Sequence, residues 1–336
     1  MKAARLQSPR KPLAIVELED PEPGPDEVVV KISSSGVCHS DLHIARGEFK
    51  GVKYPITLGH EPAGYVHSFG SGVQSLKKGQ SVLVYAGSVC GRCNYCLRGE
   101  ENYCESGEFF GFDRDGANAE YLLVKSPRYL FPIAGLTTDE ACPLACAGIT
   151  AYHAVKTEAL PVLHPEDYVV VIGVGGLGHI GIQLLKRLSP SQIIAVDNRR
   201  ESLSLAEKLG ADHAILRGKG LASQILKVSK RKVGVVIDFV GSNLTLAPSY
   251  EILRPGGRLV IVGEAGGSFK VTASSTIGRE VHGSVYGSFN ELREVVELAR
   301  QRQIKVMVKT YPLKEVNGVL TMLEEGRITG RAVLKP

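Results

Sequence analysis

Short hydrophobic runs alternate with turn residues over the first hundred residues of the chain. Residues 27–32 (EVVVKI) follow the turn-rich stretch PEPGPDE, and residues 81–85 (SVLVY) follow a Lys-Gly-Gln turn. Short β-rich runs at this spacing are typical of a compact β domain. We therefore expect a β-rich, barrel-like domain here, followed by a helical, alanine-rich stretch from about residue 138.

A different period begins at Asp167, where apolar strand patterns alternate with amphipathic helix patterns. This alternation predicts βαβ units, and hence a parallel sheet with helices on both faces. The expected strands cover residues 168–172, 192–196, 233–237, 258–262 and 281–284, and the first two precede helices at 177–188 and 200–209. Ser288 and Glu291 predict a capping box for a further helix through Arg300.

Length and composition bound the class of protein. A chain of 336 residues exceeds one ordinary domain, so two domains are expected. The net charge of +5 is spread along the chain, which predicts neither nucleic-acid nor membrane binding. No apolar segment resembles a secretory signal or a spanning helix, so we expect a cytoplasmic protein with reduced thiols rather than a disulfide framework.

A glycine-rich turn joins the expected strand 168–172 to its helix. The turn reads G-x-G-G-x-G, from Gly173 through Gly175, Gly176 and Leu177 to Gly178. In this strand–turn–helix setting, the glycines permit a tight turn, close approach of a pyrophosphate and close helix–strand packing. The pattern therefore predicts a Rossmann-type dinucleotide site, with the helix N-terminus facing the phosphates.

Asp197 ends the next expected strand and decides the expected nucleotide. A carboxylate there accepts hydrogen bonds from the ribose hydroxyls and repels a 2′-phosphate, so NAD is favoured over NADP. Arg199 and Arg200 follow directly, and arginines at this place can accommodate that phosphate. The position of the acid at the strand end favours NAD.

Seven cysteines form two groups and a remainder. Cys90, Cys93, Cys96 and Cys104 read C-x2-C-x2-C-x7-C, which predicts a tetrahedral, structural zinc site with no open position. Cys38, His60 and Cys146 are far apart in the sequence. Two thiolates and one imidazole would leave zinc a fourth position for water or substrate, but spacing alone does not link them. Cys142 is expected to be a core residue.

Several motifs in a fixed order resemble the medium-chain, zinc-dependent alcohol dehydrogenase family along essentially the whole chain. They are the segment 36–41 (GVCHSD), the segment 59–64 (GHEPAG) with Gly70, the four-cysteine lobe, Cys146 with Thr150, and the glycine turn with Asp197. The resemblance implies a GroES-like catalytic domain at residues 1–152 and 288–336, with the zinc lobe at about 87–106. A Rossmann NAD-binding domain at 153–287 would be inserted between its two parts.

The resemblance also implies roles for single residues. Cys38, His60 and Cys146 would bind a catalytic zinc with Glu61 behind it, so each chain would hold two zinc ions. Asp41 would orient His60. Ser40 would accept the proton of the alcohol and pass it by way of the cofactor ribose to His43. Further cofactor contacts are implied for His39, Thr150, Arg200, Val262 and Arg331.

The expected activity is reversible oxidation of an alcohol to an aldehyde or ketone, with hydride transfer to NAD. The compact length resembles that of microbial members that are usually tetrameric, so a homotetramer is favoured over a dimer. Phe49 and Tyr85 stand near pocket positions of the family, where many relatives have Trp; this chain has none.

Two alternatives remain open. The first is a related dehydrogenase for a polyol, threonine or formaldehyde adduct, although Cys146 argues against the polyol group, which usually has Glu there. The second is a zinc-dependent nucleic-acid or partner-binding module, which would leave the glycine turn, Ser40 and His43 without purpose.

Overall fold

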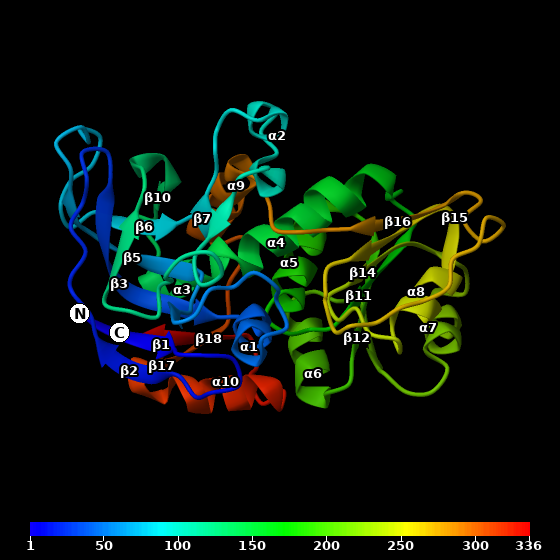
Figure 1. Ribbon diagram of the computed structural model, residues 1–336. Helices are drawn as coiled ribbons and strands as arrows, with labels where there is room; N and C mark the ends of the chain where they lie inside the picture. The colour runs from blue at the N-terminus through cyan, green and yellow to red at the C-terminus, as the bar shows by residue number, and fades with distance from the viewer. The chain divides into compact units, whose positions relative to one another are not determined.

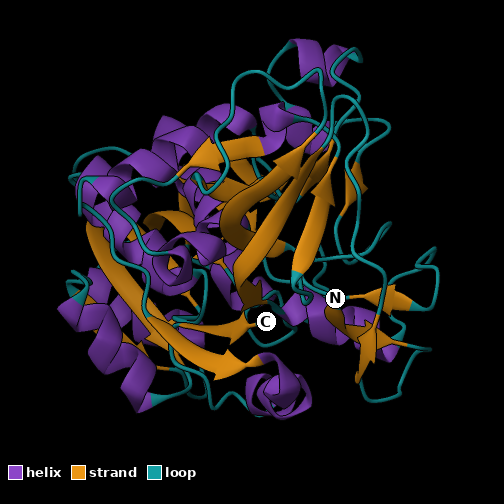
Figure 2. Ribbon diagram, turned by 90° about the vertical axis from the view of Figure 1, so that its left-hand side faces the viewer, coloured by secondary structure: helices purple, strands orange, loops and turns teal.

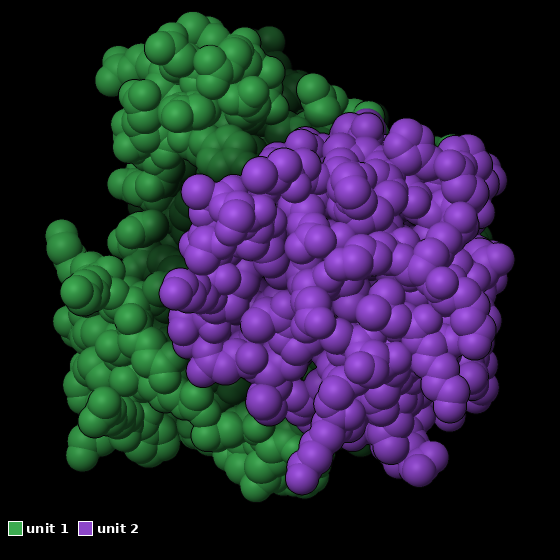
Figure 3. Space-filling view, turned by 90° about the vertical axis from the view of Figure 1, so that its right-hand side faces the viewer, with its two compact units in different colours: residues 1–147, 288–336 green, residues 148–287 purple.

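The computed structural model describes residues 1–336 and divides into two compact units, which Figure 3 colours separately. The first unit comprises Met1–Ala147 and Ser288–Pro336, and the second comprises Gly148–Gly287. The sequence places the domain boundaries after residue 152 and before residue 288, and this domain assignment stays a prediction. None of the helices combines the length and apolarity that crossing a membrane requires.

The first unit is built on a seven-stranded sheet in the order β10-β6-β5-β3-β18-β17, with β9 paired to β3 (Figures 1 and 2). All pairs are antiparallel except β17 with β18. Its strands are β3 (Val28–Val37), β5 (Glu61–Phe69), β6 (Ser81–Val84), β9 (Tyr121–Val124), β10 (Leu130–Pro132), β17 (Val308–Pro312) and β18 (Arg331–Lys335). The β-rich prediction for this part of the chain is confirmed.

Two smaller sheets and a set of helices complete the first unit. The sheets are β2-β1-β4 (Ala14–Glu17, Lys2–Leu6, Ile56–Thr57) and β7-β8 (Gly87–Ser88, Glu108–Phe109). The α-helices are α1 (His39–Arg46), α2 (Asn94–Leu97), α3 (Thr138–Ala141), α9 (Phe289–Arg300) and α10 (Val316–Glu324). Short helical turns are η1 (Glu101–Tyr103), η2 (Pro127–Tyr129), η3 (Cys142–Ala145) and η6 (Leu313–Glu315).

The core next to α1 joins chain segments from both ends of the sequence. Leu42 and Ile44 of α1 pack in one cluster with Val316 and Leu320 of α10 and with Leu334 of β18. The apolar residues of α10 recur at helical spacing, so they form one stripe toward this core. The capping box predicted for α9 is confirmed, because Ser288 accepts from the Glu291 N–H and Glu291 bonds back to the Ser288 N–H.

The second unit is a six-stranded, all-parallel sheet in the order β13-β12-β11-β14-β15-β16. α5 and α6 pack on each other beside β12, and α7 packs on α8, so helices cover both faces (Figure 1). The predicted parallel fold is confirmed. Its strands are β11 (Tyr168–Ile172), β12 (Gln192–Asp197), β13 (His213–Leu216), β14 (Val233–Asp238), β15 (Leu253–Ile261) and β16 (Arg279–Gly283).

Helices of the second unit follow the predicted alternation. They are α4 (Ala147–His153), α5 (Gly178–Leu188), α6 (Arg200–Lys208), α7 (Leu221–Ser229) and α8 (Leu246–Glu251), with a π-helix η4 (Ala154–Ala159) and a turn η5 (Leu160–Val162). β15 begins earlier than predicted, at Leu253. The sheet admits its Pro-Gly-Gly segment because the register between β14 and β15 shifts between Val233 and Val235.

Asp167 and Arg254 form a two-pronged ion pair that joins the start of β11 to β15. Arg254 Nε lies 2.8 Å from Asp167 Oδ1, and Arg254 Nη2 lies 2.6 Å from Oδ2. Burial alone would raise the pKa of Asp167, but the hydrogen bonds from Arg254 and from the His164 N–H outweigh it and lower the pKa.

Replacing Asp167 by Asn therefore tests how much this pair holds the second unit together. We expect D167N to lower the free energy of unfolding by about 2 to 3 kcal/mol at pH 7, since a mostly buried guanidinium loses its partner. Because the folded pKa is depressed, the stabilisation is present above the unfolded pKa of about 3.9 and is lost as pH falls below it. Urea unfolding at pH 7 and near pH 3 measures this.

The matched control is Glu251→Gln, which removes an exposed carboxylate of α8 in the same unit. Its unfolding free energy should stay within about 0.5 kcal/mol of the parent at both pH values. An equal loss in D167N at pH 7 and pH 3 would contradict the ion-pair account.

Candidate functional site

Cys38 lies where β3 ends and α1 begins. It is the N-cap of α1. Asp41, in the first turn, accepts a hydrogen bond from the Cys38 N–H through a carboxylate oxygen at 2.9 Å. An acidic residue at this place satisfies a backbone donor of the helix start and favours the helix dipole. The local sequence therefore fixes both the Cys38 backbone and the Asp41 side chain, which is only 1% exposed.

Asp41 also reaches the segment before β5. Its Oδ1 accepts from the Gly59 N–H at 3.3 Å and lies 3.5 Å from His60 Nδ1. The buried Nδ1 of His60 has no closer polar partner in the structure. This arrangement turns Nδ1 toward the carboxylate and leaves the other ring nitrogen, Nε2, for a metal ion, as in carboxylate–histidine–metal sites.

Glu61 follows His60 as the first residue of β5 and is fully buried. Arg331, at the start of β18 and only 3% exposed, binds it through two nitrogens, with Nε at 3.0 Å from Oε2. Gly36 stands opposite Glu61 in the β3–β5 register, and a Cβ on Gly36 would overlap the Glu61 carboxylate. The absence of a side chain at residue 36 is therefore what gives this buried ion pair its space.

Cys146 follows η3 and completes a cluster in the first unit. Its sulfur, the Cys38 sulfur, a His60 ring nitrogen and a Glu61 oxygen all lie within 4.8 Å of one another. Two sulfurs, one imidazole and one carboxylate form a donor set that suits zinc. The structure thus brings together Cys38, His60 and Cys146, which the sequence alone left unlinked.

The charges of the cluster are coupled. A hydrogen bond with Cys146 and the nearby Arg331 and His60 cations lower the pKa of Cys38, despite its burial. Burial alone would lower the pKa of His60, but the Asp41 carboxylate and Cys38 outweigh it and raise the pKa. The hydrogen bond with Cys38, followed by burial, raises the pKa of Cys146. One thiol is therefore ready to ionise, and the second needs a further positive charge, which a divalent metal supplies.

Ser40 and His43 lie on α1 beside the cluster. The Ser40 hydroxyl is 3.8 Å from the Cys38 sulfur. His43 is one helical turn further on, so both side chains lie on one side of α1. His43 Nδ1 binds a carboxylate oxygen of Glu48, and that hydrogen bond lowers the pKa of Glu48. The sequence did not single out Glu48.

Aromatic rings in mutual contact lie between His43 and the Cys38–His60–Cys146 cluster. Phe49 meets His43 edge-on at 5.8 Å between ring centroids, Phe112 meets Phe49 at 5.5 Å, and Phe112 lies 5.4 Å from His60. Phe49 was a predicted pocket residue, whereas sequence reasoning missed Phe112, which no short motif marks. Tyr85 has no exposed surface, and its ring packs at 4.5 Å against Phe289, which is the environment of a core residue.

Cys90, Cys93, Cys96 and Cys104 form the second metal-ligand group, again with all four sulfurs within 4.8 Å. Backbone N–H groups of Arg92 and Cys93 point at the Cys90 sulfur and lower its pKa to about 6. Burial raises the pKa of Cys96 to about 12. The sulfurs of Cys90 and Cys96 are 4.0 Å apart, which excludes a disulfide between them. Four converging thiols with no other ligand suit a closed structural zinc site.

The predicted glycine turn has the geometry that its residues require. Gly173 has a φ of 88°, which favours glycine, and a Cβ on Gly178 would overlap the Gly173 carbonyl oxygen. A Cβ on Gly175, in contrast, would meet nothing within 4 Å. Gly175 therefore borders open space at the start of α5, where a pyrophosphate fits against backbone N–H groups.

Asp197 is the last residue of β12 and is mostly buried beside this turn. Its Oδ2 accepts from the Val174 N–H at 2.7 Å, and its Oδ1 accepts from the Arg199 N–H at 2.9 Å. The two hydrogen bonds fix the carboxylate at the carboxyl end of the strand. Arg200, the first residue of α6, is exposed.

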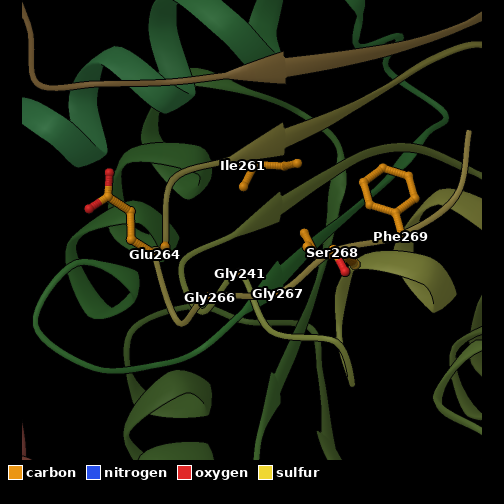
Figure 4. Close-up of a pocket in the computed structure, with 9 residues that line it drawn as sticks. Gly241, Ile261, Glu264, Gly266, Gly267, Ser268 and Phe269 are labelled. Carbon is orange, nitrogen blue, oxygen red and sulfur yellow. The ribbon is translucent and has the colours of Figure 1, made fainter. Parts of the chain in front are cut away.

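The remaining predicted cofactor residues are dispersed. Thr150 lies on α4, Val262 follows β15, His39 is exposed on α1, and Arg331 is bound by Glu61. The neighbours of Val262 in the chain, Ile261 and Gly263, line a groove of about 420 Å³ beyond the ends of β14 and β15. Glycines 241, 266 and 267 form much of its wall, and Glu264 and Phe269 lie at opposite ends of the labelled residues in Figure 4. Doubly wound sheets bind their ligands along this carboxyl edge.

Comparison with known proteins agrees with both units. The family model described as "Alcohol dehydrogenase GroES-like domain" matches residues 24–135, and the one described as "Zinc-binding dehydrogenase" matches residues 176–301. An NAD-dependent alcohol dehydrogenase of Sulfolobus acidocaldarius is 38% identical, over 100% of this chain and 99% of that protein. The chain belongs to the medium-chain, zinc-dependent alcohol dehydrogenase family.

Two further relatives show the breadth of this family. The crystal structure of the alcohol dehydrogenase from Aeropyrum pernix superposes with a TM-score of 0.93 at 42% identity, with complete coverage of both chains. A D-arabinose 1-dehydrogenase (NADP(+)) of Saccharolobus solfataricus is 36% identical over 100% of this chain and 97% of that protein. The resemblance and the fold class predicted from the sequence, GroES-like and Rossmann, are both confirmed.

Replacing Gly36 by Ala tests whether the buried pair depends on the missing side chain. We expect G36A to lower the free energy of unfolding by about 3 kcal/mol, because the added methyl group displaces Glu61 from Arg331. Urea unfolding measures the loss. Gly318→Ala in α10 is the matched control, since its Cβ would meet nothing within 4 Å, and it should be neutral or stabilising by up to about 1 kcal/mol. Equal stability of G36A and the parent would refute this account of the pair.

Proposed function

We propose that the protein is a zinc-dependent alcohol dehydrogenase that oxidises an alcohol to an aldehyde or ketone, reversibly, with NAD as its hydride acceptor. The observation that carries the proposal is the cluster of Cys38, His60 and Cys146 with the Ser40 hydroxyl beside it. A cluster of this composition leaves a ligand position open beside a side chain that can accept a proton.

Cys38, His60 and Cys146 would hold the catalytic zinc, with Glu61 behind them. When bound, the zinc supplies a Lewis acid that lowers the pKa of the alcohol hydroxyl, and NAD supplies the hydride acceptor. Asp41 fixes the tautomer of His60 through Nδ1, so that Nε2 stays unprotonated. Arg331 balances the charge of Glu61 within the buried cluster.

Ser40 and His43 are the proposed route for the proton. Ser40 Oγ accepts it from the alcohol hydroxyl, since this oxygen lies beside the Cys38 sulfur. His43, whose side chain is 23% exposed, releases it to solvent. Phe49 and Phe112 would exclude water from the space between His43 and His60 and limit the size of the substrate.

The second unit would bind NAD. The glycine turn Gly173–Gly178 would hold the pyrophosphate at the start of α5, and Asp197 would accept hydrogen bonds from the ribose. We further propose that Arg200 lies at the edge of the nucleotide, and that His39, Thr150 and Val262 contact the cofactor. The four-cysteine lobe would hold a second, structural zinc ion.

A sugar or polyol dehydrogenase is the second candidate, because the D-arabinose 1-dehydrogenase relative shares the whole length of the chain. The name of that relative gives NADP as its cofactor, which makes Arg199 and Arg200 beside Asp197 relevant to nucleotide choice. We also propose a cytoplasmic homo-oligomer, with a tetramer favoured over a dimer.

Loss of one zinc ligand tests the catalytic site directly. We expect Cys146→Ser to lower kcat/KM for alcohol oxidation by about a thousandfold, since Lewis-acid stabilisation is worth several kcal/mol. Metal analysis should find one zinc per chain instead of two. Cys142→Ser is the control, because that thiol is buried four residues earlier, its pKa is raised by burial, and it belongs to neither ligand group. Full activity of C146S would defeat the proposal.

Replacing Asp197 by Asn tests the nucleotide. The amide keeps an acceptor oxygen but loses the charge, so we expect the preference for NAD over NADP in kcat/KM to fall about tenfold. Rates with NAD and NADP, measured for primary, secondary and aromatic alcohols and for sugars, check this and distinguish the two candidates. Glu201→Gln, an exposed carboxylate nearby on α6, should leave the ratio unchanged. A parent enzyme that prefers NADP would contradict the assigned role of Asp197.

A further inference from the structure

Glu48 is held against His43 by the way α1 ends. Gly47 terminates the helix with a φ of 73°, the left-handed conformation that favours glycine. The Glu48 N–H then donates to the His43 carbonyl at 2.9 Å, which directs the chain back along the last turn. The Glu48 carboxylate consequently meets His43 Nδ1, although five positions separate the two residues.

The surroundings restrict both side chains. Phe49 packs edge-on against the His43 ring. The second oxygen of Glu48 lies 3.8 Å from Arg46 Nη1, and Arg46 is bound on its other side by Glu324 of α10. The carboxylate is therefore held between an imidazole and a guanidinium, with 47% of its side chain still exposed.

We propose that Glu48 is a positioning residue for proton release, which holds His43 with Nδ1 protonated and so presents Nε2 as the proton acceptor. A neutral imidazole has one N–H and one lone pair, and an ionised carboxylate only accepts. A contact at Nδ1 thus determines which nitrogen carries the proton. The inference rests on the proposed function only for the direction of the proton.

Glu48 also favours the cation that forms when His43 Nε2 gains a proton. The other ionisable groups around this pair are His39 and Arg46 of α1, Arg10 of the segment between β1 and β2, and Glu324 of α10. Arg46 and Arg10 oppose that cation, and Glu324 partly neutralises Arg46. Glu48 is the carboxylate in direct contact with the ring. Removing its charge should therefore change the protonation of the His43 ring more than removing the charge of Glu324.

The direct test is NMR of the histidine ring nitrogens in the full-length protein, with His43→Gln to assign the signals. We expect neutral His43 to be protonated at Nδ1 in the parent and to shift toward Nε2 protonation in Glu48→Gln, whose amide can donate to Nδ1. Glu48→Asp, which keeps the charge, should restore much of the Nδ1-protonated form.

Kinetics give a second measurement on the same variants. The pH profile of kcat/KM should be displaced toward lower pH in E48Q, because the carboxylate that contacts the His43 ring has lost its charge. Glu324→Gln, which removes a charge of equal sign from the far side of Arg46, should change neither the tautomer nor the profile.

An unchanged tautomer and profile in E48Q, or equal shifts in E48Q and E324Q, would overturn the inference. The NMR result decides it even if the protein oxidises no alcohol, in which case the proposed function fails separately.

Discussion

The buried ion pair of Glu61 and Arg331 is the interaction on which the candidate catalytic site depends. It joins β5 to β18 across the β3 strand, and it places a permanent cation beside two cysteines and a histidine. Two buried charges are costly unless they are well paired, so each partner requires the other. Gly36 meets this requirement on β3, because it leaves room for the carboxylate. The register of β5, β3 and β18 thus determines whether Glu61 and Arg331 can pair, and with it the charge balance of the site.

The fold was predictable from the sequence because its signals are local. Alternating strands and helices after Asp167 predicted the parallel sheet, and the glycine turn lies where its strand and helix require. The four-cysteine lobe was equally predictable, since all four ligands fall within fifteen residues. The expected strands did not include β13, and the boundaries of β15 differed, where a register shift admits a Pro-Gly-Gly segment.

The candidate site was predictable only in part. Cys38, His60 and Cys146 were connected by resemblance to a family, because Cys146 lies more than eighty residues after His60 and no spacing rule joins ligands so far apart. The pairing of Glu61 with Arg331 spans 270 positions and follows from strand order, which the sequence does not state. No local pattern marks Phe112 either, because its contacts with Phe49 and His60 also depend on the fold. Glu48 could have been found, since a carboxylate after a helix-ending glycine folds back toward the last turn.

The two cysteine groups reach the thiolate state by different physical means. In the lobe, backbone N–H groups of a short loop are the main cause that lowers the pKa of Cys90, so its ionisation depends mainly on local chain geometry. Cys38 is buried, and its lowered pKa depends on Cys146, Arg331 and His60, which come from three other parts of the chain. The lobe can therefore take up its metal as soon as its own loop forms. The cluster around Cys38 needs β3, β5 and β18 in register first, which makes the catalytic metal a reporter of the completed first unit.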